Sequence, residues 1–269
     1  IKALITALTF LTCRLNVWQA DSNELEDFET YRLLDFNYPQ QVQQFIDNWF
    51  IKDVENQDSE KGKRLKAELD SAERKRLQDL VQNPLRLSLL CAIWQEEEGN
   101  LPRTKAGLYA RYVKYFYSWK NKYFQVKTKQ QRELNSALGC LSLRDINQDS
   151  SRFRMQESFI VKELGEPDQE DSLFYKALEI GWLNHVGFAA ESASKEKLYA
   201  FYHATFEEYF AATAINDWKY FLHHVPSEPE KGSYKIFEPE WREVILLWLG
   251  REDIDDEQKN AFIRSLVTF

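Results

Sequence analysis

The spacing of apolar residues at intervals of three and four positions is the feature that most constrains the fold of this chain. After Pro39, which is suited to open a helix, this spacing places one set of side chains on a single helix face: Val42, Phe45, Ile46, Trp49 and Phe50. Comparable helical patterns recur over residues 84–95, 104–117, 128–143, 158–164, 171–180, 203–216, 241–249 and 258–267. The sequence therefore predicts a mainly α-helical protein.

Two regions depart from the helical pattern. Residues 182–188 and 197–202 read as two strands joined by a polar loop, and a hairpin that follows two or three helices is typical of a winged-helix domain. Within the apolar run Ile1–Arg14, residues Ala7–Cys13 suit a buried strand of the parallel type, the type found in α/β domains, whose end delivers Arg14 to a surface. Between these regions, residues 54–80 carry many charges with no net sign and a thin stripe of leucines. This pattern predicts two solvent-exposed helices, the second of which starts at Asp70 and Glu73.

Composition excludes several classes of protein. The chain has 269 residues but only 9 glycines, which argues against glycine-rich phosphate loops, and no Walker A motif occurs in it. A net charge of −8 weighs against nucleic acid as a partner. Cys13, Cys91 and Cys140 are widely spaced in apolar surroundings, so we expect reduced core residues of a cytoplasmic protein. No apolar run is long enough to cross a membrane.

No self-contained active site is evident among the polar residues. The four histidines lack the spacing of a metal site, and we interpret the adjacent His223 and His224 as surface residues on one helix. No serine nucleophile motif is present. No metal ligand and no catalytic residue is therefore predicted.

Three positions stand out on physical grounds. Arg14 ends an apolar strand, where a charge needs a ligand, a carboxylate or solvent. Pro84, preceded by Asn83, starts a helix that is apolar nearly all round, and His203 lies where a strand meets the start of a helix, which favours anions. The alternatives are a salt bridge for Arg14, a plain helix start for Pro84 and a core hydrogen bond for His203.

Four segments at these positions resemble a bacterial NACHT-family NTPase, one branch of the signal-transducing (STAND) ATPases. They are Leu11–Arg14, similar to the sensor 1 strand; Asn83–Leu87 with Cys91 and Trp94, similar to the helical-domain motif; Leu101–Thr104 with Leu108 and Tyr109, similar to the entry of the winged-helix region; and Phe201–Ala212, similar to the signature F-x-H-x-T-F-x-E-[YF]-F-A-A. The last is the most specific. Together the segments cover residues 1 to about 216, and the tail from Trp241 resembles the start of a HEAT-like helical array.

The resemblance implies four parts: the edge of the nucleotide-binding core (1–38), a helical domain (39–100), a winged-helix region (101–225), and a linker with the first array helices (226–269). It further implies that Arg14 lies near the γ-phosphate of ATP, that Pro84 lines the adenine, and that His203 contacts the β-phosphate of ADP. Glu207 and Glu208 are expected to be structural, as acids in a helix first turn. The Walker A and Walker B segments that hold Mg²⁺ are missing, because the chain is expected to start after them. We therefore expect the parent protein to be an ATPase, and this fragment alone neither to hydrolyse ATP nor to bind ATP or ADP tightly.

The predicted function is that of a regulatory fragment of a nucleotide-controlled switch, in a cytoplasmic protein without membrane contact. By family analogy the parent self-associates through its NACHT module, senses an unknown ligand through the C-terminal array and serves in bacterial defence. Two alternatives remain open. One is a winged-helix DNA-binding regulator, although the helix at 171–180 is not basic; the other is a helical scaffold without nucleotide.

Overall fold

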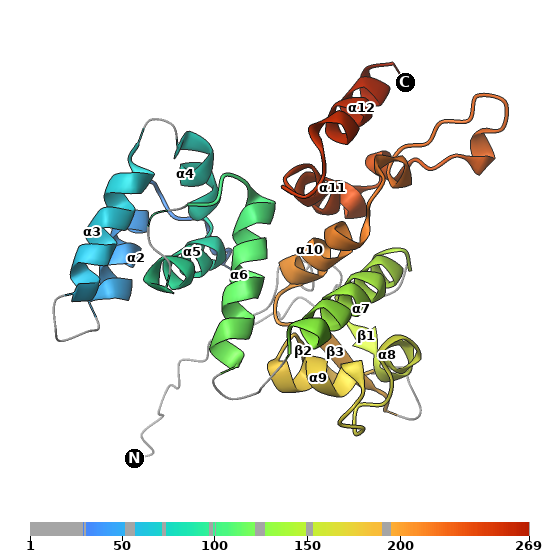
Figure 1. The fold of residues 1–269 in the computed structure, drawn as a ribbon, viewed down its shortest axis with the longest axis horizontal. Coiled ribbons are helices and arrows are strands. Elements are labelled where there is room, and N and C mark those ends of the chain that lie inside the picture. The colour runs from blue at the N-terminus through green and yellow to red at the C-terminus, as the bar shows by residue number, and fades with distance from the viewer. Residues whose placement is uncertain are drawn as a thin grey trace, which may run out of the picture.

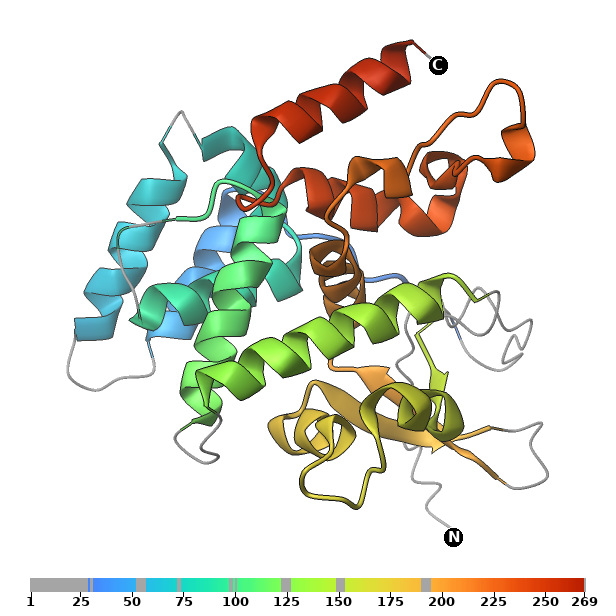
Figure 2. The same cartoon turned by 45° about the vertical axis from the view of Figure 1, so that its right-hand side comes forward.

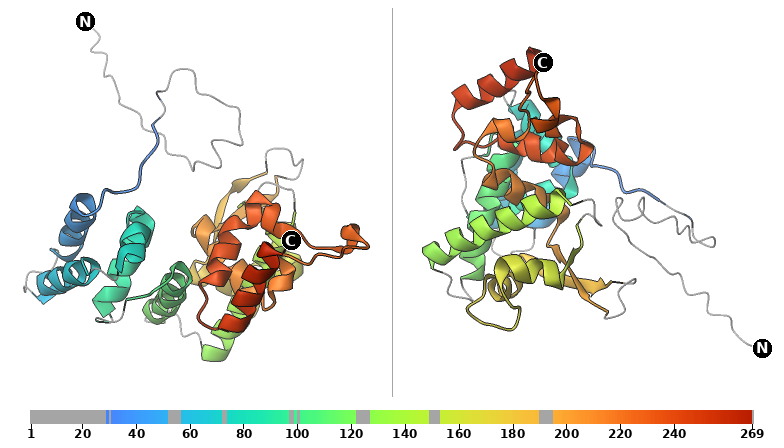
Figure 3. Two further views of the ribbon diagram at one scale, coloured as in Figure 1. Left: turned by 90° about the horizontal axis from the view of Figure 1, so that it is seen from above. Right: turned by 90° about the vertical axis from the view of Figure 1, so that its right-hand side faces the viewer.

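The computed structural model describes residues 29, 31–51, 57–71, 74–96, 99, 101–121, 127–148, 153–189 and 195–268. Over these residues the chain is mainly helical, as the apolar spacing predicted, and it carries a small three-stranded antiparallel sheet. The sequence predicted the hairpin of this sheet but not its third strand, Met155–Gln156. Helix α6 (Lys105–Lys120) stands between a group of N-terminal helices and the rest of the chain (Figures 1 and 3). The sheet and the helices that pack on it lie on the opposite side of α6 from these N-terminal helices.

The N-terminal group contains α2 (Gln40–Phe50), α3 (Gln57–Leu69), α4 (Lys75–Val81) and α5 (Pro84–Glu96). Helix α2 buries Val42, Ile46 and Phe50, three of the five residues of the predicted stripe. The predicted leucine stripe of the charged stretch is buried at Leu65, Leu69, Leu77 and Val81. Helix α5 contacts α2, α3, α4 and α6. Seven of its eight residues from Leu87 to Trp94 are buried, which confirms its prediction as a core helix.

The sheet belongs to a compact unit of alternating helices and strands. In chain order this unit consists of α7 (Thr128–Ile146), β1 (Met155–Gln156), α8 (Glu157–Leu164), α9 (Leu173–Ile180), β2 (Leu183–Phe188) and β3 (Lys197–Phe201). The strands are ordered β1-β3-β2 (Figure 2). In the hairpin of β2 and β3, Phe188 pairs with Lys197 beside the loop and Leu183 pairs with Phe201 at the other end. Gly181 ends α9 with a φ of 95°, a left-handed conformation that favours glycine. The predicted hairpin and both short helices are thus confirmed.

The C-terminal part is built on α10 (Ala204–Ala214), which packs on α7, β3, α6 and α11. Four short 3₁₀ turns follow it, at Trp218–Tyr220, Pro229–Lys231, Lys235–Phe237 and Pro239–Trp241. The last two helices are α11 (Arg242–Leu249) and α12 (Asp256–Val267). Trp182, Phe206 and Phe210 form an aromatic core between α10 and the sheet, with ring centroids 5.2–5.4 Å apart from Trp182 to each phenylalanine.

Three sequence predictions are wrong at the level of single residues. Cys140 is exposed on α7 rather than buried, because it lies on the solvent face of that helix, whereas Cys91 is buried as expected. His223 and His224 lie in a loop, since the backbone of His223 pairs with that of Ser233. Asp70 does not begin a helix: it accepts hydrogen bonds from Tyr38 and from Gln43 (3.2 Å). The predicted strand up to Arg14, and Cys13 within it, lie outside the described residues.

Candidate functional site

Pro84 occupies the first turn of α5, as predicted, and is half-buried. Asn83 caps the helix: its Oδ1 accepts the N–H of Arg86 at 3.3 Å and its carbonyl accepts the N–H of Leu87 at 3.0 Å. The chain before α2 is held at the same point, because the Phe36 N–H donates to the Gln82 carbonyl at 2.7 Å. The start of α5 is therefore held both by its own cap, Asn83, and by the chain segment before α2.

His203 is the N-cap of α10 and is also half-buried. Its Nδ1 accepts the backbone N–H of Thr205 at 3.3 Å and lies 3.0 Å from the Thr205 hydroxyl. A backbone N–H can only donate, so Nδ1 is an acceptor, and the neutral imidazole carries its hydrogen on Nε2. The His203 ring therefore presents a donor at Nε2, which is the kind of group that an anionic oxygen accepts from.

Tyr109 of α6 connects the start of α5 with His203. Its hydroxyl donates to Thr205 Oγ1 at 2.9 Å, and Thr205 in turn contacts His203. Burial raises the pKa of Tyr109, while the hydrogen bond with Thr205 and the charge and hydrogen bond of Arg86 oppose that rise. Arg86, in the first turn of α5, thus lies beside the same hydroxyl. The Tyr109 hydroxyl therefore lies between Arg86, two residues after Pro84, and Thr205, two residues after His203.

The ring of Tyr109 is held firmly between helices. It is fully buried, stacks on Tyr209 at 5.8 Å between centroids and meets Phe206 edge-on at 5.2 Å. Glu207 and Glu208 in the first turns of α10 are buried as well, with exposures of 0 and 6 %. Their structural role was expected, but the burial of both carboxyl groups was not.

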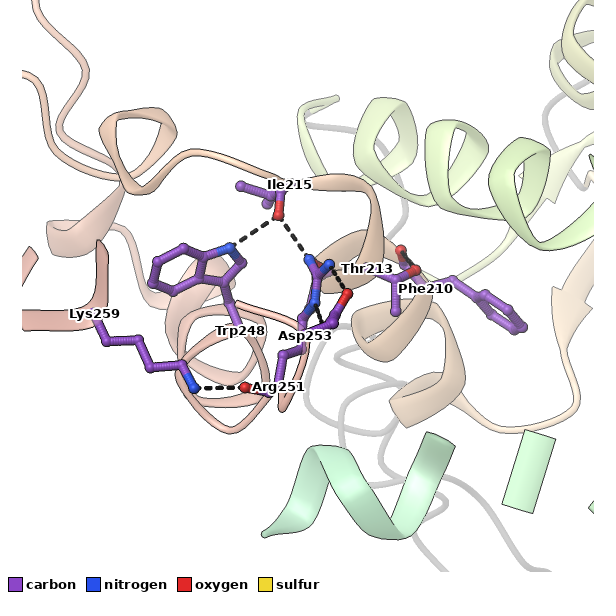
Figure 4. A network of polar contacts seen from close by, with 8 residues as sticks. Phe210, Thr213, Ile215, Trp248, Arg251, Asp253 and Lys259 are labelled. Atoms are coloured by element: carbon purple, nitrogen blue, oxygen red, sulfur yellow. Dashed lines mark hydrogen bonds and ion pairs between the residues drawn. The ribbon is translucent and has the colours of Figure 1, made fainter. Parts of the chain in front are cut away.

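A second polar network joins the C-terminal end of α10 to the turn between α11 and α12 (Figure 4). Arg251 is only 7 % exposed, and its Nη1 donates to the carbonyls of Ala212 and Ile215, both at 2.7 Å. Its Nε and Nη2 form a bidentate pair with Asp253 at 2.9 and 2.6 Å. This pair holds the pKa of Asp253 below its ordinary value. A cation at a helix C-terminus is favoured by the unpaired carbonyls there.

The same turn is also bonded to other elements. Trp248 Nε1 donates to the Ile215 carbonyl at 2.9 Å, and Lys259 Nζ of α12 donates to the Arg251 carbonyl at 2.6 Å. Thr104, the N-cap of α6, donates to the Gly250 carbonyl at 2.7 Å and accepts from the Gly107 N–H at 3.0 Å. Helix α10 is therefore tied to α6 at both of its ends.

Sequence reasoning singled out Pro84 and His203 as candidates but not Arg86, Tyr109 and Thr205, which lie between them. Arg86 and Thr205 lie within two residues of a predicted position, and that proximity was the signal available for both. Tyr109 lies within the helix predicted over residues 104–117, and the sequence does not indicate which group its hydroxyl bonds with. Nothing in the sequence around Arg251 indicates that its charge is buried. Arg14, the third predicted residue, lies outside the described residues.

Over the part of the chain that the structure describes, no group of three or more His, Cys, Asp and Glu residues could hold a metal ion. Nor does any helix there have the length and apolar character needed to span a membrane. The chain matches none of the protein-family models and none of the curated proteins with which it was compared.

Proposed function

We propose that this chain is the regulatory part of a NACHT-type signal-transducing ATPase, in which a bound ADP or ATP molecule controls the position of α10 and the unit before it. The observation that carries the proposal is the hydrogen bond between Tyr109 and Thr205, because it brings the start of α5 close to the start of α10. Arg86, two residues after Pro84, lies beside the Tyr109 hydroxyl, and Thr205, two residues after His203, contacts the His203 ring. A ligand that contacts both Pro84 and His203 would therefore favour one arrangement of α5, α6 and α10.

The topology supports the same proposal. We assign residues 128–201 to a winged-helix domain, because the order helix, strand, helix, helix, hairpin and the sheet order β1-β3-β2 are those expected of such a domain. His203 follows its last strand directly. Any movement of this domain is thereby passed to the histidine at the start of α10.

The chemistry of the residues fits a phosphate-bearing ligand. His203 has a hydrogen on Nε2, and it begins a helix whose N-terminal dipole favours negative charge. The resemblance assigns Mg²⁺ and hydrolysis to Walker segments of a longer protein. What the residues of this chain would do is bind and orient: Pro84 on the base side and His203 on the phosphate side.

The proposal extends to the rest of the molecule by analogy. Helices α11 and α12 would begin a HEAT-like array that senses a ligand, and ATP in place of ADP would release the winged-helix domain for self-association in a cytoplasmic defence protein. The bonds from Arg251 to the end of α10 provide a direct route from that array to the switch.

Hydrogen exchange on the longer protein tests the proposal. We expect ADP to protect the first turn of α10 and residues 183–201 more than ATP does. His203→Ala should remove the difference, whereas the exposed loop residue His223→Ala should leave it. Equal protection by ADP and ATP in the unaltered protein would contradict the proposal.

The isolated chain provides a second check. We expect it to show no ATP turnover, and turnover that disappears with Arg14→Ala would overturn this expectation. Salt-sensitive DNA binding in a gel shift at low salt would favour the winged-helix regulator instead.

A further inference from the structure

We propose that Tyr109 is a positioning residue that acts through the Thr205 hydroxyl to hold His203 in one ring orientation and one tautomer, so that His203 presents its Nε2 hydrogen only while α6 is docked on α10. What His203 then contacts rests on the proposed function, but the link between Tyr109 and His203 does not.

The first step is the geometry of the three side chains. Tyr109 Oη is 2.9 Å from Thr205 Oγ1, which is 3.0 Å from His203 Nδ1. The Thr205 backbone N–H donates to the same Nδ1 at 3.3 Å. The backbone N–H and the hydroxyl of Thr205 therefore both lie at His203 Nδ1. Tyr109 of α6 bonds to the hydroxyl of Thr205.

The second step is the direction in which the hydrogens point. Arg86 is a donor only, so beside the Tyr109 hydroxyl it can only donate to the oxygen. The hydrogen of Tyr109 is then directed to Thr205 Oγ1, and the hydrogen of Thr205 is directed to His203 Nδ1. Hydrogen bonds that follow one another in this way polarise and strengthen each other. The backbone N–H of Thr205 already favours the tautomer with hydrogen on Nε2, and this series of bonds adds a second donor to Nδ1 that reinforces it.

The third step is the dependence on docking. Tyr109 is fully buried between α6 and α10, and a buried hydroxyl needs a partner. If the two helices separate, Tyr109 and Thr205 both exchange their mutual hydrogen bond for bonds with water. Nδ1 of His203 then competes with water for the Thr205 hydroxyl, and the ring loses its fixed orientation.

The variant Tyr109→Phe isolates the hydroxyl. The ring contacts with Tyr209 and Phe206 involve only the aromatic carbons, so phenylalanine can keep them. Thr205→Val removes the next hydroxyl with little change in shape, and Thr205→Ser restores it. Because the chain contains only four histidines, each imidazole can be followed separately.

The test is a long-range ¹H–¹⁵N NMR spectrum of the full chain with ¹⁵N-labelled histidine, recorded at a pH at which the rings are neutral. The signals of His203 are identified by their loss in His203→Gln. We expect one tautomer, with hydrogen on Nε2, in the unaltered chain and in Thr205→Ser. In Tyr109→Phe and Thr205→Val the Nδ1 and Nε2 shifts of His203 should move toward the averaged values of the exposed His185 and His223. Unchanged His203 shifts in both of these variants, with the other three histidines also unchanged, would overturn the inference.

A second arm separates this inference from the proposed function. If His203 carries the nucleotide contact, Tyr109→Phe in the longer protein should weaken ADP binding about three- to tenfold, and Thr205→Ser should not. A tautomer change without any loss of ADP affinity would leave the positioning role of Tyr109 standing and contradict the proposed contact of His203 with ADP.

Discussion

Arg251 has the most buried positive charge among the described side chains with an ion pair, and the structure explains how this charge is tolerated. Its partner Asp253 is 70 % exposed, so the guanidinium is not matched by an equally buried anion. Instead the carbonyls of Ala212 and Ile215 at the end of α10 accept from it. A buried charge is costly unless it is paired and hydrogen-bonded, and here both conditions are met.

We expect Arg251→Met to lower the free energy of unfolding by about 2–4 kcal/mol, because the carbonyls of Ala212 and Ile215 lose their bonds with a buried cation. The Ile215 carbonyl then keeps only the bond from Trp248 Nε1. Arg264→Met, at an exposed position on α12, is the matched control and should change the free energy by less than about 0.5 kcal/mol. Urea denaturation followed by circular dichroism measures both. Equal losses in the two variants would show that the network in Figure 4 does not stabilise the chain.

The hydroxyl of Thr104 takes part in two hydrogen bonds, one as a donor and one as an acceptor. Thr104→Ala should cost about 1–2 kcal/mol, because both the N-cap bond to Gly107 and the bond to the Gly250 carbonyl are lost. Thr104→Ser retains the hydroxyl and should recover most of this loss in the same urea titration. If serine is no better than alanine, the methyl group of Thr104 rather than its hydroxyl is the source of the stability.

At the scale of the elements, periodicity predicted the helices well because most of them have one buried stripe. The expected helix at 203–216 is observed as Ala204–Ala214, and the expected helix at 171–180 as Leu173–Ile180. Failures occur where no stripe exists. The loop around His223 is shaped by backbone pairing with Ser233 and by 3₁₀ turns, neither of which has a periodic pattern.

The turn between α11 and α12 contains two aspartates whose pKa values are lowered. The pKa of Asp253 is lowered chiefly by its hydrogen bond with Arg251. The pKa of Asp255 is lowered chiefly by the hydrogen bond that its side chain accepts from the backbone N–H of Gln258. A carboxyl group with a lowered folded pKa contributes stability above its unfolded pKa of about 3.9, and this contribution is lost as the pH falls through the folded pKa. The turn should therefore weaken below about pH 4.

The measurement is the urea midpoint between pH 7 and pH 3. We expect the double variant Asp253→Asn, Asp255→Asn to be less stable than the unaltered chain at pH 7 and to lose less stability on acidification, because asparagine does not titrate. Asp168→Asn with Asp171→Asn, two exposed positions between α8 and α9, should retain the original pH dependence. If both pairs flatten the profile equally, net charge rather than the turn determines the acid sensitivity.

At the scale of the whole molecule, the sequence predicted the parts of the candidate site but not their assembly. Pro84 and His203 were singled out from helix-start chemistry, which is local, and their role in a site stays a prediction. The bond from Tyr109 to Thr205 spans 96 positions and the bonds from Arg251 to α10 span 36 and 39. Such contacts depend on how the helices pack, and neither composition nor periodicity contains that information. The exposure of Cys140 was missed for the same reason: an apolar neighbourhood in sequence does not decide which face of α7 meets the core.

The central claim is that His203 joins this chain to a nucleotide, and calorimetry of ADP binding to the longer protein tests it most directly. We expect His203→Ala to weaken binding by about 1–3 kcal/mol, the cost of removing a hydrogen bond to a charged group. The exposed His223→Ala should bind ADP as the unaltered protein does. An unchanged affinity in His203→Ala would contradict the claim, and the role left to His203 would be that of the N-cap of α10.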